Sequence, residues 1–513
     1  MILKARILEF EAKKPIVILN KADADDLGVK PLDRVELFAK KRRMTAIVNI
    51  AEKFIRQGWI GLYGRLQEEL QIKEGMDIEI KPIEQPMSIL YIKNKLAGKV
   101  LRPEQLRQIV QDIVDQKLSE IEMTSFVTAL YNHGLTMEEA ASLSIAMAET
   151  GKVLKLKTGP VFDKHSIGGV PGDKTSILLV PIIASAGLII PKTSSRSITS
   201  AAGTADRMEC LAPVELEMEE IKRVVEHTNG CLVWGGAVEL APADDILIQI
   251  EYPLAIDPLL LPSVMSKKKA VQAKYLVIDI PTGRGAKIKT IGEANELAGQ
   301  FIELGKRLDI NTKCISTFGE QPLGYCIGPA LEAREALETL MNIGKQPFDL
   351  IDKVTEIASA LLEFKGIRNA REKVRQIIKS GKAEKKLREI IEAQGGDSKI
   401  KPDEIPIGDK CAKIKSVAKG RVLWINNHAI ATIAREAGAP ADKGAGIILR
   451  KKLGDDVKEG DVLFEIYAEK NYKLERALKL TEELNVMGIA ERQSMLLAKI
   501  PEERHKKVFI LER

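Results

Sequence analysis

Between about residues 160 and 340, short runs of β-branched residues alternate with stretches of helical periodicity. The runs are VFDKH at 161–165, GLIIPKT at 187–193, CLVWG at 231–235, YLVIDI at 275–280 and KCISTF at 313–318. Strands that alternate with helices in this way form parallel sheets with helical crossover connections. The pattern predicts an α/β domain, which we place at residues 159–400. The loops that follow its strands should share one edge of the sheet.

The rest of the chain divides into three further modules. Within residues 1–85, ADDLGVKPLDRVELF at 24–38 is echoed by QEELQIKEGMDIEIK at 67–81, and each copy reads as a short helix, a turn and a strand. Such a duplication is typical of a double-psi-like β-barrel, in which two related halves bury one core. Residues 86–158 are predicted to form a helical domain that residues 240–272 complete. Residues 405–513 are predicted to form a C-terminal α+β domain, so the fold class is multidomain α/β.

Two capping boxes mark helix starts inside the helical domain. Helical periodicity covers about residues 103–117, 120–132 and 137–150. Ser119 with Glu122, and Thr136 with Glu139, place a hydroxyl and a carboxyl where they can satisfy the N–H groups of a first helical turn. The sequence therefore predicts helices that begin directly after Ser119 and Thr136.

The C-terminal module contains a turn sequence without the residue that usually gives it a function. GDDVKEGDVLFEI at 454–466 resembles the turns of biotinyl and lipoyl domains. The Met-Lys-Met carrier site of those domains is absent. We therefore expect the module to have a structural role.

Charge and aromatic content argue against a nucleic-acid partner. The 78 Lys plus Arg residues nearly balance the 72 Asp plus Glu residues, which leaves a net charge of +6, and only 4% of residues are aromatic. Nucleic-acid binding needs a strongly basic surface, and single strands also need exposed rings for stacking.

Neither a bound metal nor a membrane is indicated. The five cysteines lie far apart without a CxxC pair, and the histidines lack metal-ligand spacing. The longest uncharged run, Thr175 to Pro191, is short for a membrane span, and the first residues lack the apolar run of a signal peptide. We expect a cytoplasmic protein that needs no metal or other cofactor.

The strongest local signal is a glycine-rich loop between a strand and an apolar helix. It reads KHSIGGVPGDKTS at 164–176. Glycines let backbone N–H groups approach an anion, and the following helix N-terminus adds partial positive charge. The alternative is a plain glycine-rich turn, but the added charge and hydroxyl donors favour an anion site. The candidate phosphate-binding residues are Lys164, Ser166, Gly168, Gly169 and Ser176.

A second loop with anion-binding character follows the next strand. It reads KTSSRSITSAAGT at 192–204 and combines several hydroxyls with one guanidinium. Because it also follows a strand of the predicted sheet, it can face the same ligand as the first loop, although a polar surface loop is the alternative. Two anion sites side by side suit a reaction between free phosphate and a substrate that already carries one. The candidates are Ser194 and Thr204 for phosphate, and Ser195, Arg196, Ser197, Ile198, Thr199 and Ser200 for a nucleotide.

These motifs resemble the thymidine and pyrimidine-nucleoside phosphorylase family. The first loop matches the pattern K-H-S-x-G-G-V-x-G-D, and further matches are residues 194–206, SVMSKK at 263–268 and residues 279–286. The resemblance covers about residues 90–510. It implies reversible phosphorolysis between a helical and an α/β domain, and a homodimer or higher homo-oligomer. Carried over to this chain, the phosphate site is Lys164, Ser166, Ser176, Ser194 and Thr204, with His165 and Gly168 beside it, and the base side is Ser263 and Lys267.

Departures from the family pattern point to one branch of it. Where pyrimidine enzymes have an arginine, this chain reads Ile246-Leu247-Ile248-Gln249-Ile250, and the family's G-R-G-L-G becomes Ser195-Arg196-Ser197-Ile198-Thr199. Pro171 is an extra residue, and a family aromatic is replaced by the cations of Gly283–Lys289. With the N-terminal barrel, these features resemble the archaeal branch that acts on nucleoside monophosphates. That resemblance implies conversion of AMP and phosphate to adenine and ribose 1,5-bisphosphate, with CMP and UMP as further candidate substrates.

The leaving base needs an acid. Asp257 precedes the Ser263 helix, and burial would raise its pKa and keep a proton available; the alternative is that Asp257 caps that helix, and the resemblance favours the acid. His165 is either a support for the phosphate loop or a proton carrier. Lys287 and Lys289 are candidates for the nucleotide phosphate, with a solvated surface as the alternative.

Three rival functions stay open on the sequence. A thymidine or pyrimidine-nucleoside phosphorylase would act on nucleosides rather than on AMP. A phosphoribosyltransferase would need Mg²⁺ and a diphosphate substrate. A non-enzymatic nucleotide-sensing scaffold would release no base.

Overall fold

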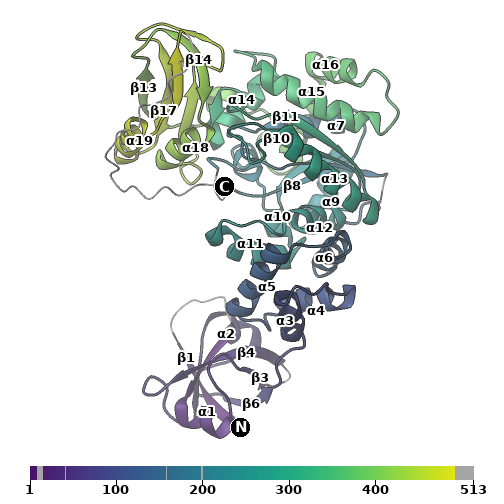
Figure 1. The fold of residues 1–513 in the computed structure, drawn as a ribbon, viewed down its shortest axis with the longest axis vertical. Helices are drawn as coiled ribbons and strands as arrows, with labels where there is room; N and C mark the ends of the chain where they lie inside the picture. The colour runs from purple at the N-terminus through teal and green to yellow at the C-terminus, as the bar shows by residue number, and fades with distance from the viewer. Residues whose placement is uncertain (9–14, 41, 158, 198–199, 492–513) are drawn as a thin grey trace.

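The computed structural model describes residues 1–8, 15–40, 42–157, 159–197 and 200–491. The N-terminal barrel, a helical layer and the α/β domain follow one another along its long axis, and the C-terminal domain lies beside the α/β domain (Figure 1). The predicted multidomain α/β architecture is confirmed.

The described residues between 1 and 83 form a closed six-stranded barrel. Its strands are β1 (Ile2–Ile7), β2 (Ile16–Asn20), β3 (Arg34–Ala39), β4 (Arg42–Ala51), β5 (Trp59–Leu62) and β6 (Asp77–Ile83), in the order β1-β5-β2-β4-β3-β6. The repeated segments contain α1 (Lys21–Leu27) followed by β3, and α2 (Gly64–Leu70) followed by β6. Alternating residues point inward, so that Leu3, Ala5, Val17 and Leu19 are buried. The duplication thus produces one shared core.

The barrel contacts the helical domain through Arg34. This side chain is 2% exposed and is paired with Glu122, and its Nε donates to Lys117 O at 2.7 Å. Glu122 also belongs to a capping box, so the contact joins β3 to the start of a helix.

The helical domain combines two stretches of chain. It contains α3 (Ser88–Leu96), α4 (Pro103–Val114), α5 (Glu120–His133) and α6 (Met137–Glu149), together with α11 (Pro242–Leu254) and α12 (Leu260–Ala270). Both capping boxes are present, with Ser119 N donating to Glu122 Oε2 at 2.7 Å and Thr136 N donating to Glu139 Oε2 at 2.9 Å. The helix starts predicted after Ser119 and Thr136 are confirmed.

The α/β domain carries five parallel strands. Strands β11 (Asn311–Phe318), β10 (Ala273–Thr282) and β7 (Val161–Ser166) form one sheet, and β8 (Ile190–Ser194) pairs with β9 (Gly230–Trp234). A parallel bridge between Val161 and Ile189 joins the two. The helices are α7 (Thr175–Ser185), α8 (Thr204–Met208), α9 (Met218–Thr228), α10 (Gly235–Val238), α13 (Ile291–Arg307), α14 (Pro329–Leu340), α15 (Phe348–Glu363), α16 (Ala370–Lys379) and α17 (Lys382–Ala393).

Helix α7 explains the long uncharged run. Every residue from Thr175 to Ala184 is buried, because α7 packs between the sheet and helices α15 and α17. This run is therefore the centre of the α/β core.

The C-terminal domain shares a sheet with the α/β domain. Its elements are the 3-10 turn Pro402–Glu404, β13 (Lys410–Lys415), β14 (Gly420–Ile425), α18 (Asn427–Glu436), β15 (Gly446–Leu449), β16 (Asp456–Val457), β17 (Val462–Ala468), α19 (Asn471–Glu483) and β18 (Met487–Ala490). Strand β12 (Cys326–Ile327) comes from the α/β domain and pairs with β15. The two domains are therefore joined by backbone hydrogen bonds as well as by the chain.

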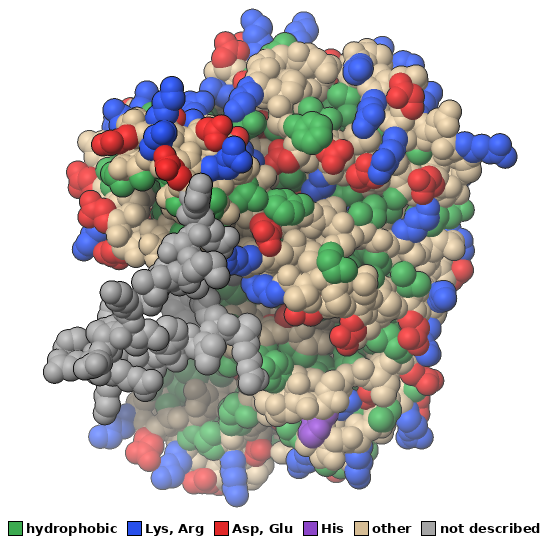
Figure 2. All heavy atoms as spheres, turned by 45° about the horizontal axis from the view of Figure 1, so that its top comes forward, with side chains coloured by type: hydrophobic (Ala, Val, Ile, Leu, Met, Phe, Trp, Pro, Cys, Tyr) green, Lys and Arg blue, Asp and Glu red, His purple; other side chains and the backbone are tan. Residues whose placement is uncertain are grey.

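The surface mixes charges of both signs. On the face seen in Figure 2, Lys and Arg side chains lie interspersed with Asp and Glu. Within the described ranges, none of the helices has the length and apolar character to cross a membrane.

Candidate active site

The first loop leaves β7 at Ser166 and enters α7 at Thr175. Gly168, Gly169 and Gly172 have φ values of +85°, +90° and +77°, which side chains other than glycine rarely adopt. A Cβ on Gly169 would lie 2.6 Å from Lys287 N, whereas the space beside Gly168 is open. Among the described residues, the N–H groups of Gly168 and Gly169 have no hydrogen-bond acceptor. The loop thus presents donors toward open space, as an anion site requires.

Lys164 supplies positive charge under this loop. The residue is 2% exposed, and no carboxylate in the described part of the chain forms an ion pair with it. Burial lowers its pKa, and the charges of Asp173 and Asp279 act in the opposite direction. A buried ammonium without an ion-pair partner is stabilised by any anion that reaches it.

A buried ion cluster holds the loop from below. Lys353 on α15 lies 2.8 Å from Asp279 Oδ2 and 3.6 Å from Asp173 Oδ2. Asp279 on β10 also accepts from Ser166 Oγ at 2.7 Å. Burial alone would raise the pKa of Asp173, but the charges of Lys353 and Lys164 hold it well below its ordinary value. The cluster thus fixes both ends of the first loop.

Ser176, another phosphate candidate, is buried in the first turn of α7. The neighbouring Thr175 Oγ1 is buried without a hydrogen-bond partner among the described residues. The start of α7 therefore keeps hydroxyl capacity that the protein itself does not use.

The second loop lies at the same sheet edge as the first. It leaves β8 at Ser194, and β8 runs parallel to β7 beside it. Ser194 Oγ donates to Val233 O at 3.1 Å, and Thr204 begins α8. Arg207, one turn further on, is close enough to lower the pKa of Lys164. The two stretches therefore meet on one side of the molecule.

Carboxylates organise the second loop and occupy its arginine. Asp206 Oδ2 accepts from Ser197 N at 2.7 Å and Gly203 N at 2.8 Å. Arg196 pairs with Glu209 at 2.6 Å and with Glu215 at 2.8 Å, so its charge is already compensated. Ser197 Oγ and Ser200 Oγ lie 3.2 Å apart, and Ser195 O accepts from Ala205 N at 3.4 Å. Ile198 and Thr199, both nucleotide candidates, lie outside the described residues.

The base-side candidates converge on one carboxylate. Ser263 Oγ lies 3.0 Å and Lys267 Nζ 2.5 Å from Asp244 Oδ2. Asp244 is buried in the first turn of α11, and Ser263 and Lys267 lie one turn apart on α12. Burial would lower the pKa of Lys267, but Asp244 and Asp245 raise it overall.

His165 lies among lysines. Burial and the charges of Lys268, Lys192 and Lys164 lower its pKa well below the ordinary value, so it is neutral at pH 7. Burial and the same positive surroundings also lower the pKa of Lys192 to about 7. Lys268 is paired with buried Asp163 at 2.7 Å. The pair of Lys268 and Asp163 thus joins β7, which leads into the first loop, to helix α12.

Asp257 differs from the prediction in one respect. The expected burial is wrong, because 46% of the side chain is exposed, and its Oδ2 lies 3.4 Å from Lys287 Nζ. Between α11 and α12, Ala255 and Asp257 are exposed whereas Leu259 is buried, and no side chain caps α12. Lys287 N in turn lies against Gly169 of the first loop. Asp257 is therefore one lysine away from the anion loop, whereas Lys289 Nζ donates to Ala286 O at 2.8 Å.

Glu251 is a buried carboxyl that the sequence analysis did not identify. It lies on α11, and its Oε1 accepts from Leu259 N at 3.2 Å. Burial and the charges of Asp257 and Asp244 raise its pKa to about 8. A protonated carboxyl is thus kept close to Asp257 at neutral pH.

Lys353 was missed as well, although the sequence carried a signal. It occupies the apolar face of α15 with Leu350, Val354 and Ile357, where a lysine needs a buried partner. The partners, Asp173 and Asp279, lie 180 and 74 residues away along the chain, so no local pattern identifies them.

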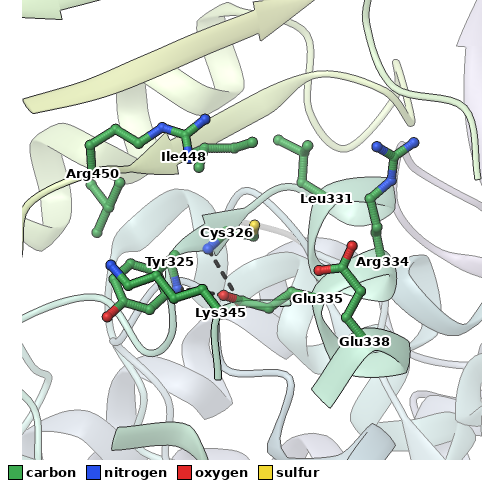
Figure 3. Close-up of a pocket in the computed structure, with 10 residues that line it drawn as sticks. Tyr325, Cys326, Leu331, Arg334, Glu335, Glu338, Lys345, Ile448 and Arg450 are labelled. Atoms are coloured by element: carbon green, nitrogen blue, oxygen red, sulfur yellow. Dashed lines mark hydrogen bonds between the residues drawn. The ribbon is translucent and has the colours of Figure 1, made fainter. Parts of the chain in front are cut away.

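One cavity of the molecule lies away from these residues. It has a volume of about 240 Å³ and lies between the α/β and C-terminal domains, where none of the predicted site residues lines it (Figure 3). Within the described residues, no group of three or more His, Cys, Asp or Glu is placed to hold a metal ion.

Comparison with known proteins first gives the class. Residues 158–384 match the glycosyl transferase family a/b domain, residues 90–151 its helical bundle domain, and residues 422–487 the pyrimidine nucleoside phosphorylase C-terminal domain. Anthranilate phosphoribosyltransferase from Thermus thermophilus shares the fold, with a TM-score of 0.50 and 19% identity over 59% of this chain and 98% of that chain. The fold and the site thus define a glycosyl transferase built from a helical bundle and an α/β domain.

Full-length relatives then give the family. The AMP phosphorylase of Thermofilum pendens is 48% identical over 100% of both chains. That of Thermococcus kodakarensis is 50% identical over 95% of this chain and 98% of its own, and that of Methanocaldococcus jannaschii is 48% identical over 98% and 99%. The chain belongs to the AMP phosphorylase family.

Proposed function

We propose that this protein is a nucleoside 5′-monophosphate phosphorylase that converts AMP and phosphate to adenine and ribose 1,5-bisphosphate. The observation that carries the proposal is the meeting of two anion-binding loops beside Lys164, a buried cation with no ion-pair partner in the described chain. CMP and UMP are further candidate substrates. The expected setting is the cytoplasm, and the expected assembly is a homodimer or higher homo-oligomer.

The first loop holds the attacking phosphate. Lys164, Ser166, and the N–H groups of Gly168 and Gly169 surround its oxygens, with Ser176, Ser194 and Thr204 nearby. One phosphate oxygen bonds to C1′ as the C1′–N9 bond of AMP breaks, through a state with positive charge on the sugar. The negative phosphate stabilises that charge.

The leaving adenine takes up the electron pair of the broken bond and needs a proton. Asp257 takes a proton from Glu251, whose pKa is raised to about 8, and passes it to the base, which leaves Glu251 as a carboxylate. Lys287 pairs with Asp257 and lies against the first loop, so the acid and the nucleophile are held in fixed relation. Ser263 and Lys267 face the base, and Lys287 and Lys289 are the candidates for the 5′-phosphate.

The decisive experiment is incubation with AMP and phosphate followed by chromatography for adenine. Adenine release that depends on phosphate and persists after chelation of metal ions would support the proposal. Such a reaction would need no metal or other cofactor. Lys164→Met should abolish it. Release that needs Mg²⁺ and diphosphate would indicate a phosphoribosyltransferase instead.

A pyrimidine-nucleoside phosphorylase is the second candidate, and the C-terminal family match favours it. The residues at the position of its arginine oppose it, because Ile246 and Ile250 pack into the helical core. Faster turnover of thymidine or uridine than of AMP would support this rival. Binding of AMP without any base release would support a nucleotide-sensing scaffold.

A further inference from the structure

Three side chains of the C-terminal domain reach into the α/β domain, and each contacts a different segment of the site. They are Asn427, Lys443 and Lys452, and they come from α18, from the loop before β15 and from the loop after it. The C-terminal domain is thus connected to the site by these side-chain contacts as well as by the sheet that it shares with the α/β domain.

Lys452 braces the first loop through one intermediate segment. Its side chain is 10% exposed, and its Nζ donates to Pro322 O, to Gly324 O at 2.8 Å and to Asp349 Oδ2 at 2.8 Å. Leu323 lies between these carbonyls and the loop. Its N donates to Pro171 O at 3.0 Å.

The first loop contacts the same segment from the other side. Lys174 Nζ donates to Leu323 O at 2.9 Å and pairs with Glu335 at 2.5 Å. Glu335 also accepts from Tyr325 N at 2.8 Å and Cys326 N at 3.2 Å, the latter drawn as a dashed line in Figure 3. A Cβ on Gly172 would lie 2.5 Å from Leu323 O, so loop and segment are in direct backbone contact. Because the segment contacts both Lys452 and the loop directly, we expect a change in the position of Lys452 to change the position of the loop.

Asn427 braces the turn that carries Lys287. The residue is 1% exposed at the start of α18, and its Nδ2 donates to Gly319 O at 2.9 Å and Gly285 O at 3.2 Å. A Cβ on Gly285 would lie 2.6 Å from that amide nitrogen. The turn is thus held between Asn427 on one side and Gly169 of the first loop on the other.

Lys443 braces the second loop through its carboxylates. Its Nζ pairs with Glu209 and lies 3.9 Å from Asp206 Oδ1. Glu209 holds Arg196, and Asp206 holds the N–H groups of Ser197 and Gly203. Lys443 is therefore linked to the backbone of the second loop through a single intervening residue.

We propose that the C-terminal domain is a positioning element of the active site, in which Lys452, Asn427 and Lys443 fix the first loop, the 283–289 turn and the second loop. The proposal rests on the proposed function for what those segments bind. None of the three residues touches substrate. Each acts through the segment that it holds, so each should affect a different step.

The test compares Lys452→Met and Lys443→Met with matched controls. Lys451→Met removes a lysine whose contacts stay inside the C-terminal domain, with Asp461 at 2.8 Å, and Lys473→Met removes one paired with Asp442 at 2.7 Å. Because small misplacements of binding groups are costly, we expect Lys452→Met to raise the KM for phosphate about tenfold and Lys443→Met to raise the KM for AMP about tenfold. The two controls should leave both constants unchanged.

Two further variants separate positioning from stability. Gln321→Ala removes only the hydrogen bond from Leu453 N to Gln321 Oε1 at 2.9 Å and leaves no buried charge. It should also raise the KM for phosphate. It therefore provides the test if Lys452→Met does not fold. Lys452→Arg keeps a cation and should recover part of the phosphate affinity. Asn427→Ala should lower kcat more than either KM, because the turn carries the partner of Asp257.

Binding of inorganic phosphate measured by calorimetry needs no turnover, so it tests the brace even if AMP is not cleaved. Absence of adenine release in every protein, wild type included, would refute the proposed function. The phosphate affinities would then decide whether Lys452 positions the first loop. Equal phosphate affinity in wild type, Gln321→Ala and every folded Lys452 variant would overturn the proposal. Equal changes of the KM for phosphate and the KM for AMP in all variants and controls would also overturn the proposal. A domain that only stabilises the protein would affect both constants alike.

Discussion

Removing the Lys353 ammonium should destabilise the α/β domain far more than removing an exposed lysine in a similar ion pair. Lys353 is 6% exposed and lies 2.8 Å from Asp279, whose side chain is fully buried. Loss of one partner from a buried pair leaves an uncompensated charge and costs about 3–5 kcal/mol. We therefore expect Lys353→Met to lower the free energy of unfolding of this domain by about that amount.

The matched control is Lys313→Met. Lys313 lies 2.9 Å from Glu363, also on α15, but the two side chains are 40% and 53% exposed. Exposed pairs contribute about 0–1 kcal/mol. The comparison thus changes burial while the distance stays nearly constant, and both pairs join α15 to a strand of the same sheet.

Tryptophan fluorescence can report on this domain alone. The three tryptophans, Trp59, Trp234 and Trp424, lie in the barrel, the α/β domain and the C-terminal domain. A Trp59→Phe, Trp424→Phe background leaves Trp234 as the reporter during denaturant unfolding. A cost for Lys353→Met no larger than that for Lys313→Met would refute the reasoning.

The pH dependence of the same variant has a definite sign. In the folded protein, Lys353 and Lys164 hold the pKa of Asp173 below its ordinary value of 3.8. This group therefore contributes stability above pH 3.8 that is lost as the pH falls through the folded-state pKa. The difference between wild type and Lys353→Met should be largest at neutral pH and shrink on acidification.

Three further predictions concern the residues around the acid and the first loop. Asp257→Asn should slow adenine release by about 10²- to 10⁴-fold and leave AMP binding by calorimetry largely intact; unchanged turnover would remove Asp257 from the acid role. The pKa of Glu251 is raised from 4.5 to about 8, so wild type should lose stability as the pH rises through this range, and melting curves of Glu251→Gln should lack that slope. Gly169→Ala should cost about 1–2 kcal/mol more than Gly168→Ala, because both have positive φ but only the first meets Lys287 N; equal melting temperatures would contradict this.

Local signals in the sequence predicted the elements well. The capping boxes at Ser119 and Thr136 depend on residues three positions apart, and the helices begin where those residues indicate. The β-branched runs lie on strands β7 to β11, and the buried parallel strands β7 to β10 need such residues on both faces. The position of the two candidate loops followed from the same pattern, since loops after parallel strands share one edge.

The contacts that complete the site could not be predicted in this way. Lys353 and Lys452 are ordinary lysines by their neighbours in sequence, and their partners are set by tertiary packing. The exposure of Asp257 depends on how the segment between α11 and α12 turns, which its position before the Ser263 helix does not specify. Arg196 looked free for a ligand, whereas Glu209 and Glu215 compensate it in the folded chain.

The pairing of β12 with β15 sets an order of events during synthesis on the ribosome. Cys326 finds its partner Ile448 only after more than a hundred further residues have emerged, and Lys452 emerges later still. Domains that precede in the chain fold first, so a nascent protein should contain both loops long before the C-terminal domain contacts them. Stalled or truncated chains ending before this point should thus be compact yet bind phosphate more weakly than the full chain.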